Sequence, residues 1–130
     1  GRAGTSTPFS TGRCLSTDDA NYAKVDHKYQ HCSTYFRENR RRPVKAGLLT
    51  SNPWKLSNMH GNVSEWCLDW YSFYSPDSAT DPKGPSLGNE RVMRGGHWQA
   101  KATECRLAKR LRFPPKIASD VVGFRLVMVP

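Results

Sequence analysis

Apolar and aromatic positions gather in four short stretches of this chain, and long polar segments separate them. Glu65–Tyr71 is aromatic and alternates in part, and Arg91–Arg94 is a shorter stretch, so a strand is predicted over each. Within Cys105–Phe113, a mostly basic set of side chains alternates with a mostly apolar set. This pattern predicts a strand with one basic face, although a helical turn also fits the spacing. Val121–Val129 is the richest in β-branched and apolar residues and predicts the clearest strand, one that lies inside a sheet.

The segments between these strands are predicted to be loops. Residues 1–22 are rich in Gly, Ser and Thr, and a short helical turn is expected to start at Ser16 or Thr17. Residues 23–47 are polar and aperiodic, and the basic run at 37–42 within them is expected to be a solvated loop, with an anion-binding patch as the alternative. Residues 75–90 contain several Pro and Gly residues, which predict a long surface loop.

Length and composition favour one small domain. The chain has 130 residues, of which 37% are hydrophobic, so a single core is expected. No apolar run approaches the length that a bilayer span requires, so no membrane insertion is expected. The start of this sequence has no basic and then apolar leader, so no secretory signal is expected within it.

The positive charge is concentrated in the last third of the chain. The formal net charge is +9, and residues 91–130 hold nine Lys and Arg against Glu104 and Asp120. Such an excess favours anionic partners. No nucleic-acid motif accompanies the charge, so we expect a solvated basic face or an anionic ligand rather than nucleic acid.

The four cysteines are widely spaced, at 14, 32, 67 and 105. Because no C-x-x-C pair is present, a zinc site and a thioredoxin-type motif are disfavoured. One or two disulfides are expected in an oxidising compartment, with all three full pairings open, and free buried thiols are equally compatible with the spacing. His27 and His31 have i, i+4 spacing, but the weak helix character around them argues against a metal pair.

A stretch at Leu56–Trp70, LSNMHGNVSEWCLDW, concentrates oxygen donors beside a glycine. Gly61 lets the backbone turn sharply, and Asn58, Asn62 and Glu65 supply oxygens of the kind that calcium prefers. The alternative is an Asn/Gly turn that enters a strand. Spacing alone favours that alternative, because the donor set is short of carboxylates.

Four motifs place this stretch in a wider resemblance. GNVSEW, RVMRGGHW at 91–98, CRLAKR at 105–110 and VGFRLV at 122–127 occur in this order, and TSTPFSTGRCLSTDDANY precedes them at Thr5–Tyr22. Together they resemble the formylglycine-generating enzyme (sulfatase-modifying factor) family. The resemblance implies a C-type-lectin-like α+β fold with much irregular structure and short antiparallel strands. Residues 1–130 are then one domain that corresponds to the C-terminal portion of the family domain.

The resemblance also implies a structural calcium ion. Carried over position by position, its ligands are the side chains of Asn58 and Glu65 and the backbone carbonyls of Gly61 and Val63. A second family site begins at Asn21 and Tyr22, but the residues near Phe36–Pro43 do not identify its acidic partner. One calcium site is therefore expected.

The family's oxidase chemistry is not expected in this chain. Members of the family oxidise a sulfatase cysteine with oxygen, and two cysteines after the Gly-Gly motif hold copper. The first of these positions is Ala100 here and the second is Cys105, and one thiolate cannot supply a two-thiolate copper site. No catalytic residue is assigned, and Cys105 is expected to be a packed thiol or half of a disulfide. An enzyme of this family, or a related sulfoxide-synthase-type enzyme, is kept as the alternative.

The resemblance instead favours a non-catalytic binding domain. In lectin-like folds the segment between the Gly-Gly turn and the last strand is exposed, and aromatic and Arg side chains often anchor binding surfaces. The expected ligand is a protein or another macromolecule, and an anionic one suits the charge. The candidate ligand-binding residues are His97, Trp98, Gln99, Lys101, Arg106, Lys109, Arg112 and Phe113.

The same segment suggests a source of sequence diversity. Diversity-generating retroelements vary it in many variable proteins that have such a domain, and Leu107, Arg112 and Phe113 stand where the family often has small residues or Asn. Lys and Gln residues cannot arise from adenine mutation of an Asn codon ending in C, so Gln99 and Lys101 need another origin. A near-copy of the 3′ coding region beside a reverse transcriptase gene would support diversification.

Overall fold

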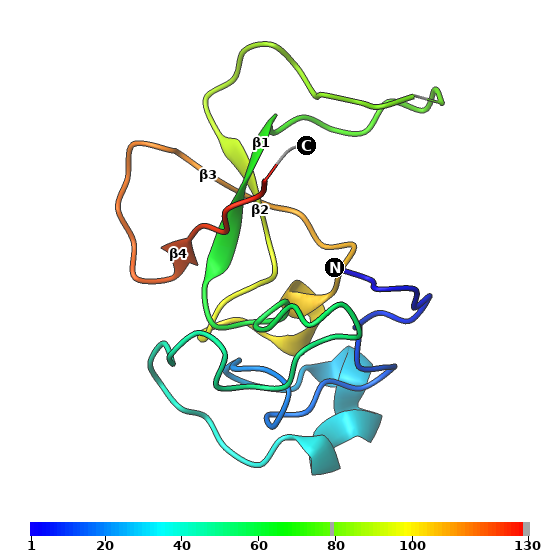
Figure 1. Cartoon of the computed structure of the whole chain (residues 1–130), viewed down its shortest axis with the longest axis vertical. Coiled ribbons are helices and arrows are strands. Elements are labelled where there is room, and N and C mark those ends of the chain that lie inside the picture. The colour runs from blue at the N-terminus through cyan, green and yellow to red at the C-terminus, as the bar shows by residue number, and fades with distance from the viewer. Residues whose placement is uncertain (79, 129–130) are drawn as a thin grey trace.

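A computed structural model describes residues 1–78 and 80–128, and it contains one small sheet and two short helices. The sheet has the order β3-β2-β1-β4 and forms the upper part of the molecule in Figure 1, above the helices. No helix among the described residues is long and apolar enough to cross a bilayer. The elements are the 3₁₀-helices η1 (His27–Tyr35) and η2 (Ala102–Cys105) and the strands β1 (Ser64–Trp70), β2 (Arg91–Arg94), β3 (Leu111–Phe113) and β4 (Val122–Gly123).

The two central strands agree with the sequence pattern. β2 has the predicted bounds, and β1 begins one residue earlier and ends one residue earlier than predicted. β1 pairs antiparallel with β2, with Trp66 opposite Met93, and β2 pairs antiparallel with β3. These two pairings are antiparallel as expected, whereas β1 pairs in parallel with β4.

The predicted strand over Cys105–Phe113 is wrong in its first half. The chain forms η2 and a turn there, and only Leu111–Phe113 is a strand. The Glu104 carboxylate accepts a hydrogen bond from the Lys101 N–H (2.9 Å), and this capping contact closes the helical turn. Alternation along the chain could not reveal this local cap, because it depends on one side chain reaching back to the backbone.

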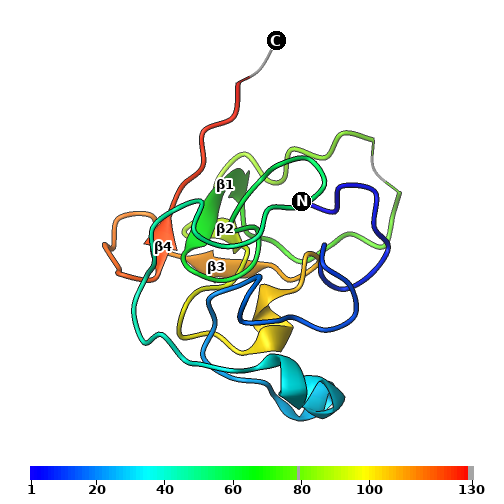
Figure 2. The same ribbon diagram turned by 60° about the horizontal axis from the view of Figure 1, so that its bottom comes forward.

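The predicted strand over Val121–Val129 is also wrong for most of its length. Only β4 is paired, and Val129 lies outside the described residues. Phe124 is 74% exposed and Met128 is 94% exposed, so this run does not lie inside the sheet. β1 offers partners to β4 only at Ser64 and Glu65, and the described tail beyond them extends away from the body (Figure 2).

Helix η1 was not predicted, because its sequence is polar and lacks an apolar stripe. Asp26 caps it by accepting a hydrogen bond from the Lys28 N–H (3.1 Å). The same carboxylate accepts hydrogen bonds from the N–H and the hydroxyl of Thr103, which joins η1 to η2. A disulfide between Cys14 and Cys32 holds the helix to the N-terminal loop.

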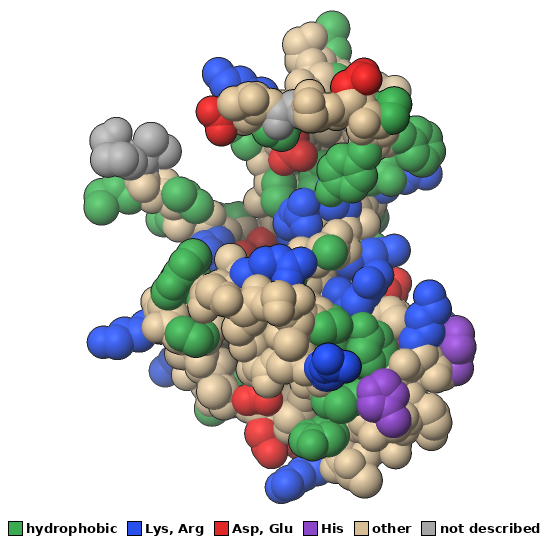
Figure 3. All heavy atoms as spheres, turned by 90° about the vertical axis from the view of Figure 1, so that its right-hand side faces the viewer, with side chains coloured by type: hydrophobic (Ala, Val, Ile, Leu, Met, Phe, Trp, Pro, Cys, Tyr) green, Lys and Arg blue, Asp and Glu red, His purple; other side chains and the backbone are tan. Residues whose placement is uncertain are grey.

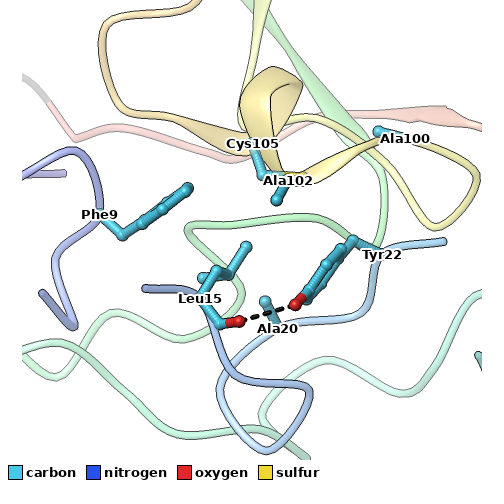
Figure 4. Packing of buried hydrophobic residues seen from close by; sticks show 7 residues of the cluster. All are labelled: Phe9, Leu15, Ala20, Tyr22, Ala100, Ala102 and Cys105. Atoms are coloured by element: carbon cyan, nitrogen blue, oxygen red, sulfur yellow. Dashed lines mark hydrogen bonds between the residues drawn. The ribbon is translucent and has the colours of Figure 1, made fainter. Parts of the chain in front are cut away.

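The hydrophobic core lies between the N-terminal segment and the region around η2 (Figure 4). The Tyr22 hydroxyl donates a hydrogen bond to the Leu15 carbonyl (2.6 Å), which satisfies the one polar atom of this large buried side chain. The core residues are Phe9, Leu15, Ala20, Tyr22, Ala100, Ala102 and Cys105.

The Gly61–Asn62 junction connects this core to the sheet. The Gly61 N–H donates to the Gly95 carbonyl (2.7 Å), and the Asn62 N–H donates to the Asn21 carbonyl (2.8 Å). The buried Asn62 amide accepts from the Val44 N–H (2.8 Å) and donates to the Val44 carbonyl (3.0 Å). Three segments that are distant in sequence therefore meet at two residues.

Gly61 is the position where this junction tolerates no side chain. Its φ is +70°, and a Cβ there would lie 2.1 Å from the Asn21 carbonyl oxygen. Gly47 also has a positive φ, of +82°, but a Cβ there would meet nothing within 4 Å. A comparison of substitutions at Gly61 and Gly47 therefore distinguishes the cost of backbone strain from the cost of steric overlap.

We predict that Gly61→Ala lowers the free energy of unfolding by about 3 kcal/mol or more, because overpacking adds to the strain of a positive φ. Gly47→Ala should cost only about 1–2 kcal/mol, from strain alone. Urea unfolding at equilibrium measures both. Equal losses in the two variants would contradict the role assigned to the Gly61–Asn62 junction.

Candidate functional site

Three of the four expected calcium-binding residues line a surface hollow. Asn58, Val63 and Glu65 line it together with Arg125, which is at the start of the C-terminal tail. The Gly61 N–H points to Gly95 in the adjoining turn. The fold therefore brings side chains of the predicted donor set to one place.

Arg125 already occupies part of that place. Its guanidinium donates to both oxygens of Glu65, at 2.6 and 2.9 Å, and also to the Ser57 carbonyl at 2.9 Å. The hydrogen bond to Glu65 raises the pKa of Arg125, so this guanidinium stays charged. The role of Arg125 was not predicted from the sequence, although a single basic side chain in the apolar VGFRLV motif is a visible signal.

The oxygen donors are of the type that a hard cation prefers, but other groups of the protein already bind them. Asn58 Oδ1 accepts a hydrogen bond from the Gly47 N–H (3.1 Å), and both oxygens of Glu65 are bound by Arg125. A carboxylate has about four lone-pair positions, so Glu65 can serve a second partner. With one shared carboxylate, this set suits weak calcium binding.

The two positions of the family's cysteine pair lie in the core. Ala100 is 1% exposed and Cys105 is 0% exposed. Burial raises the pKa of the Cys105 thiol to about 12, so it is protonated at neutral pH. Gly96 packs directly against it, since a Cβ at Gly96 would lie 2.6 Å from the Cys105 sulfur. Cys105 is a free, packed thiol rather than half of a disulfide.

His60 is a buried titratable side chain next to Cys105, and it was not predicted from the sequence to be a core residue. Its Nε2 accepts a hydrogen bond from the Ser10 N–H (3.0 Å), and its Nδ1 lies 2.8 Å from the Cys105 carbonyl. This arrangement assigns the proton to Nδ1. Burial lowers the pKa of His60, which keeps it neutral and makes it a structural link between the N-terminal loop and η2.

The candidate ligand-binding residues divide into two groups. Gln99, Lys101 and Arg112 are exposed, and the other five are half-buried. The Trp98 N–H donates to the Asn62 carbonyl (2.9 Å), so this residue is tied to the Gly61–Asn62 junction. The half-buried residues are His97, Trp98, Arg106, Lys109 and Phe113.

Aromatic and Arg side chains form a second surface feature, which was not predicted from the sequence. The Arg110 guanidinium lies 3.7 Å from the centre of the Tyr74 ring, and Arg112 lies 5.0 Å from that of Tyr71. We call Tyr71, Tyr74, Arg110 and Arg112 the aromatic–arginine cluster. Phe73 beside it is 85% exposed. The face in Figure 3 shows Lys and Arg side chains gathered next to exposed hydrophobic ones.

The fold and these motifs define a C-type-lectin-like domain, and comparison with known proteins gives its family. Residues 1–129 match the family model described as "Sulfatase-modifying factor enzyme 1-like domain". Because this match covers nearly the whole chain, the chain belongs to that family. The resemblance found in the sequence is therefore confirmed.

Curated relatives match over part of their length. The formylglycine-generating enzyme of Streptomyces coelicolor is 40% identical over 88 residues, which are 64% of this chain and 27% of that enzyme. The Chlamydia pneumoniae protein named "Serine/threonine-protein kinase pkn1" is 44% identical over 78 residues, which are 57% of this chain and 13% of that protein. The chain thus spans less than a third of the length of these relatives.

A solved structure supports the fold independently. Treponema denticola variable protein 1 superposes with a TM-score of 0.73 and 26% sequence identity. The superposition covers 95% of this chain and 41% of that protein. The chain is similar to a variable protein over almost all of its length.

Proposed function

We propose that this chain is a non-catalytic C-type-lectin-like domain that binds a macromolecular ligand through the exposed part of residues 97–117. The observation that carries the proposal is the core position of Ala100. A copper site of the family type needs a second thiolate there, and an alanine methyl group cannot coordinate metal. The remaining thiol, Cys105, is buried and protonated, so it cannot act as an exposed nucleophile.

The ligand surface combines the exposed residues of this segment with the aromatic–arginine cluster. Gln99 and Lys101 contribute polar and positive groups, and Arg112 belongs to both features. Tyr and Arg are enriched among residues that dominate binding energy. The net charge of +9 favours an anionic protein or another anionic macromolecule.

Similarity to a variable protein supports this proposal over the enzyme alternative. Treponema denticola variable protein 1 shares the fold over 95% of this chain. A retroelement-diversified binding domain would keep the scaffold and vary the exposed segment. The alternative, a formylglycine-generating oxidase or a related sulfoxide-synthase-type enzyme, is favoured by the family model and by 35–40% sequence identity to formylglycine-generating enzymes.

We predict that the copper-treated protein does not convert a cysteine-containing sulfatase peptide to formylglycine under oxygen, since only one thiol occupies the two family positions. Mass spectrometry detects the change in peptide mass. The formylglycine-generating enzyme of Streptomyces coelicolor, assayed in parallel, is the positive control. Turnover by this chain that is lost in Cys105→Ser would overturn the non-catalytic proposal.

We further propose that calcium stabilises the scaffold at Asn58, Gly61, Val63 and Glu65. When bound, the ion would supply positive charge that neutralises the carboxylate and draws the turn oxygens together. A site with one shared carboxylate belongs to the weak class, with dissociation constants of about 10⁻⁴–10⁻³ M. Arg125 competes for the same carboxylate.

Calcium at about ten times its dissociation constant should raise the melting temperature by about 5 °C, which corresponds to about 1.4 kcal/mol of linkage. Differential scanning calorimetry of chelator-treated protein measures the shift. Glu65→Gln should abolish the shift, whereas Glu90→Gln, a carboxylate paired with Arg112 elsewhere on the sheet, should retain it. No shift and no binding heat in the unmodified protein would exclude this calcium site.

A further inference from the structure

The fold assembles a set of soft metal ligands that sequence spacing did not reveal. Cys14, His31 and Cys32 each offer one ligand atom, and these atoms all lie within 4.8 Å of one another. Cys14 comes from the N-terminal loop, and the other two residues come from η1. We call these three residues the Cys–His cluster. The two cysteines are joined by a disulfide, so in this state their sulfurs are not available to a metal.

Reduction of that disulfide would change the chemistry of the cluster. Two thiolates and one imidazole are the ligands that zinc prefers, with bonds of about 2.3 Å to sulfur and about 2.0–2.1 Å to nitrogen. Tetrahedral coordination at those lengths places neighbouring ligand atoms about 3.5–3.8 Å apart. Because the cluster already lies within 4.8 Å, small side-chain movements bring it to this spacing.

The exposed His31 gives a metal ion a route to the cluster. Cys32 is buried, Cys14 is half-buried and His31 is exposed, so the cluster runs from the interior to the surface. Three protein ligands leave a fourth position, which a water molecule can take on the exposed side. Cys67 and Cys105 lie outside the cluster.

We propose that the Cys–His cluster is a redox-controlled zinc site, which binds Zn²⁺ through Cys14, His31 and Cys32 once the disulfide is reduced. A dithiol or phosphine reductant supplies the two electrons that break the sulfur–sulfur bond and is itself oxidised, and each cysteine sulfur takes up one proton. Zinc binding then displaces these two protons to solvent, because the metal binds thiolates. This proposal is independent of the proposed ligand-binding function.

The disulfide and a bound zinc ion would each hold the N-terminal loop to η1. The disulfide joins residues that are 18 apart in sequence, and such a crosslink stabilises by restricting the unfolded chain. A zinc ion bound by the same side chains would replace that restriction in a reducing environment, since metal-binding energy contributes directly to folding. η1 has a polar sequence and depends on such ties for its position.

The test uses the whole chain, reduced with a phosphine, desalted without oxygen and titrated with Co²⁺ as a spectroscopic probe. We expect one Co²⁺ per chain, with a thiolate-to-metal band in the near ultraviolet, and displacement by Zn²⁺. His31→Ala should weaken binding at least about 100-fold, because removal of a direct ligand costs more than the 10–100-fold loss seen for supporting groups. His27→Ala, on the same helix, and Cys67→Ser are the matched controls and should leave binding unchanged.

For a protein that stays folded on reduction, three results would overturn the zinc site. They are equal metal binding by the oxidised protein, loss of binding in Cys67→Ser, and the absence of binding by a reduced protein that remains folded by near-ultraviolet circular dichroism. If reduction unfolds the chain, zinc is added to the unfolded sample. Recovery of the native spectrum supports the site, and failure to recover it contradicts the site.

Discussion

The Asn62 side chain and backbone form the set of hydrogen bonds on which the rest of this structure depends. The backbone N–H of Asn62 donates to the Asn21 carbonyl, and its backbone carbonyl accepts from the Trp98 N–H. Its side-chain amide accepts from the Val44 N–H and donates to the Val44 carbonyl. Buried backbone groups need partners, and here one residue supplies them to three irregular segments. A fold with so little regular structure therefore keeps its shape through specific polar contacts as much as through its small core.

The hydrogen bonds that hold the scaffold together do not involve the exposed side chains that are proposed to contact a ligand. The Gly61–Asn62 junction fixes Trp98 at the start of residues 97–117, while Gln99, Lys101 and Arg112 remain exposed. Substitutions at exposed positions of the segment leave the junction's hydrogen bonds intact. Ala100 and Cys105, the positions that the resemblance matches to the family's cysteine pair, are core residues here. The chain keeps the scaffold of its family and has alanine at one of these two positions.

Local sequence patterns predicted the parts of the fold that depend on local forces. The aromatic alternation of β1 and the Gly-Gly end of β2 were enough to place both strands. The C-terminal run has strong strand propensity, but propensity cannot supply a neighbouring strand, and β1 pairs with it at only two residues. Helix η1 depends on Asp26, Thr103 and a disulfide, which are contacts between distant segments. The Arg125–Glu65 pair and the Cys–His cluster escaped prediction for the same reason.

Native-state amide hydrogen exchange, followed residue by residue by NMR, tests the central claim most directly. If the Gly61–Asn62 junction holds the scaffold together, the amides of Gly61, Asn62 and Trp98 exchange only through global unfolding. Their opening free energies then equal those of the central β1 and β2 amides. Exchange of these three amides through local openings of markedly lower free energy, while β1 and β2 stay protected, would contradict the account.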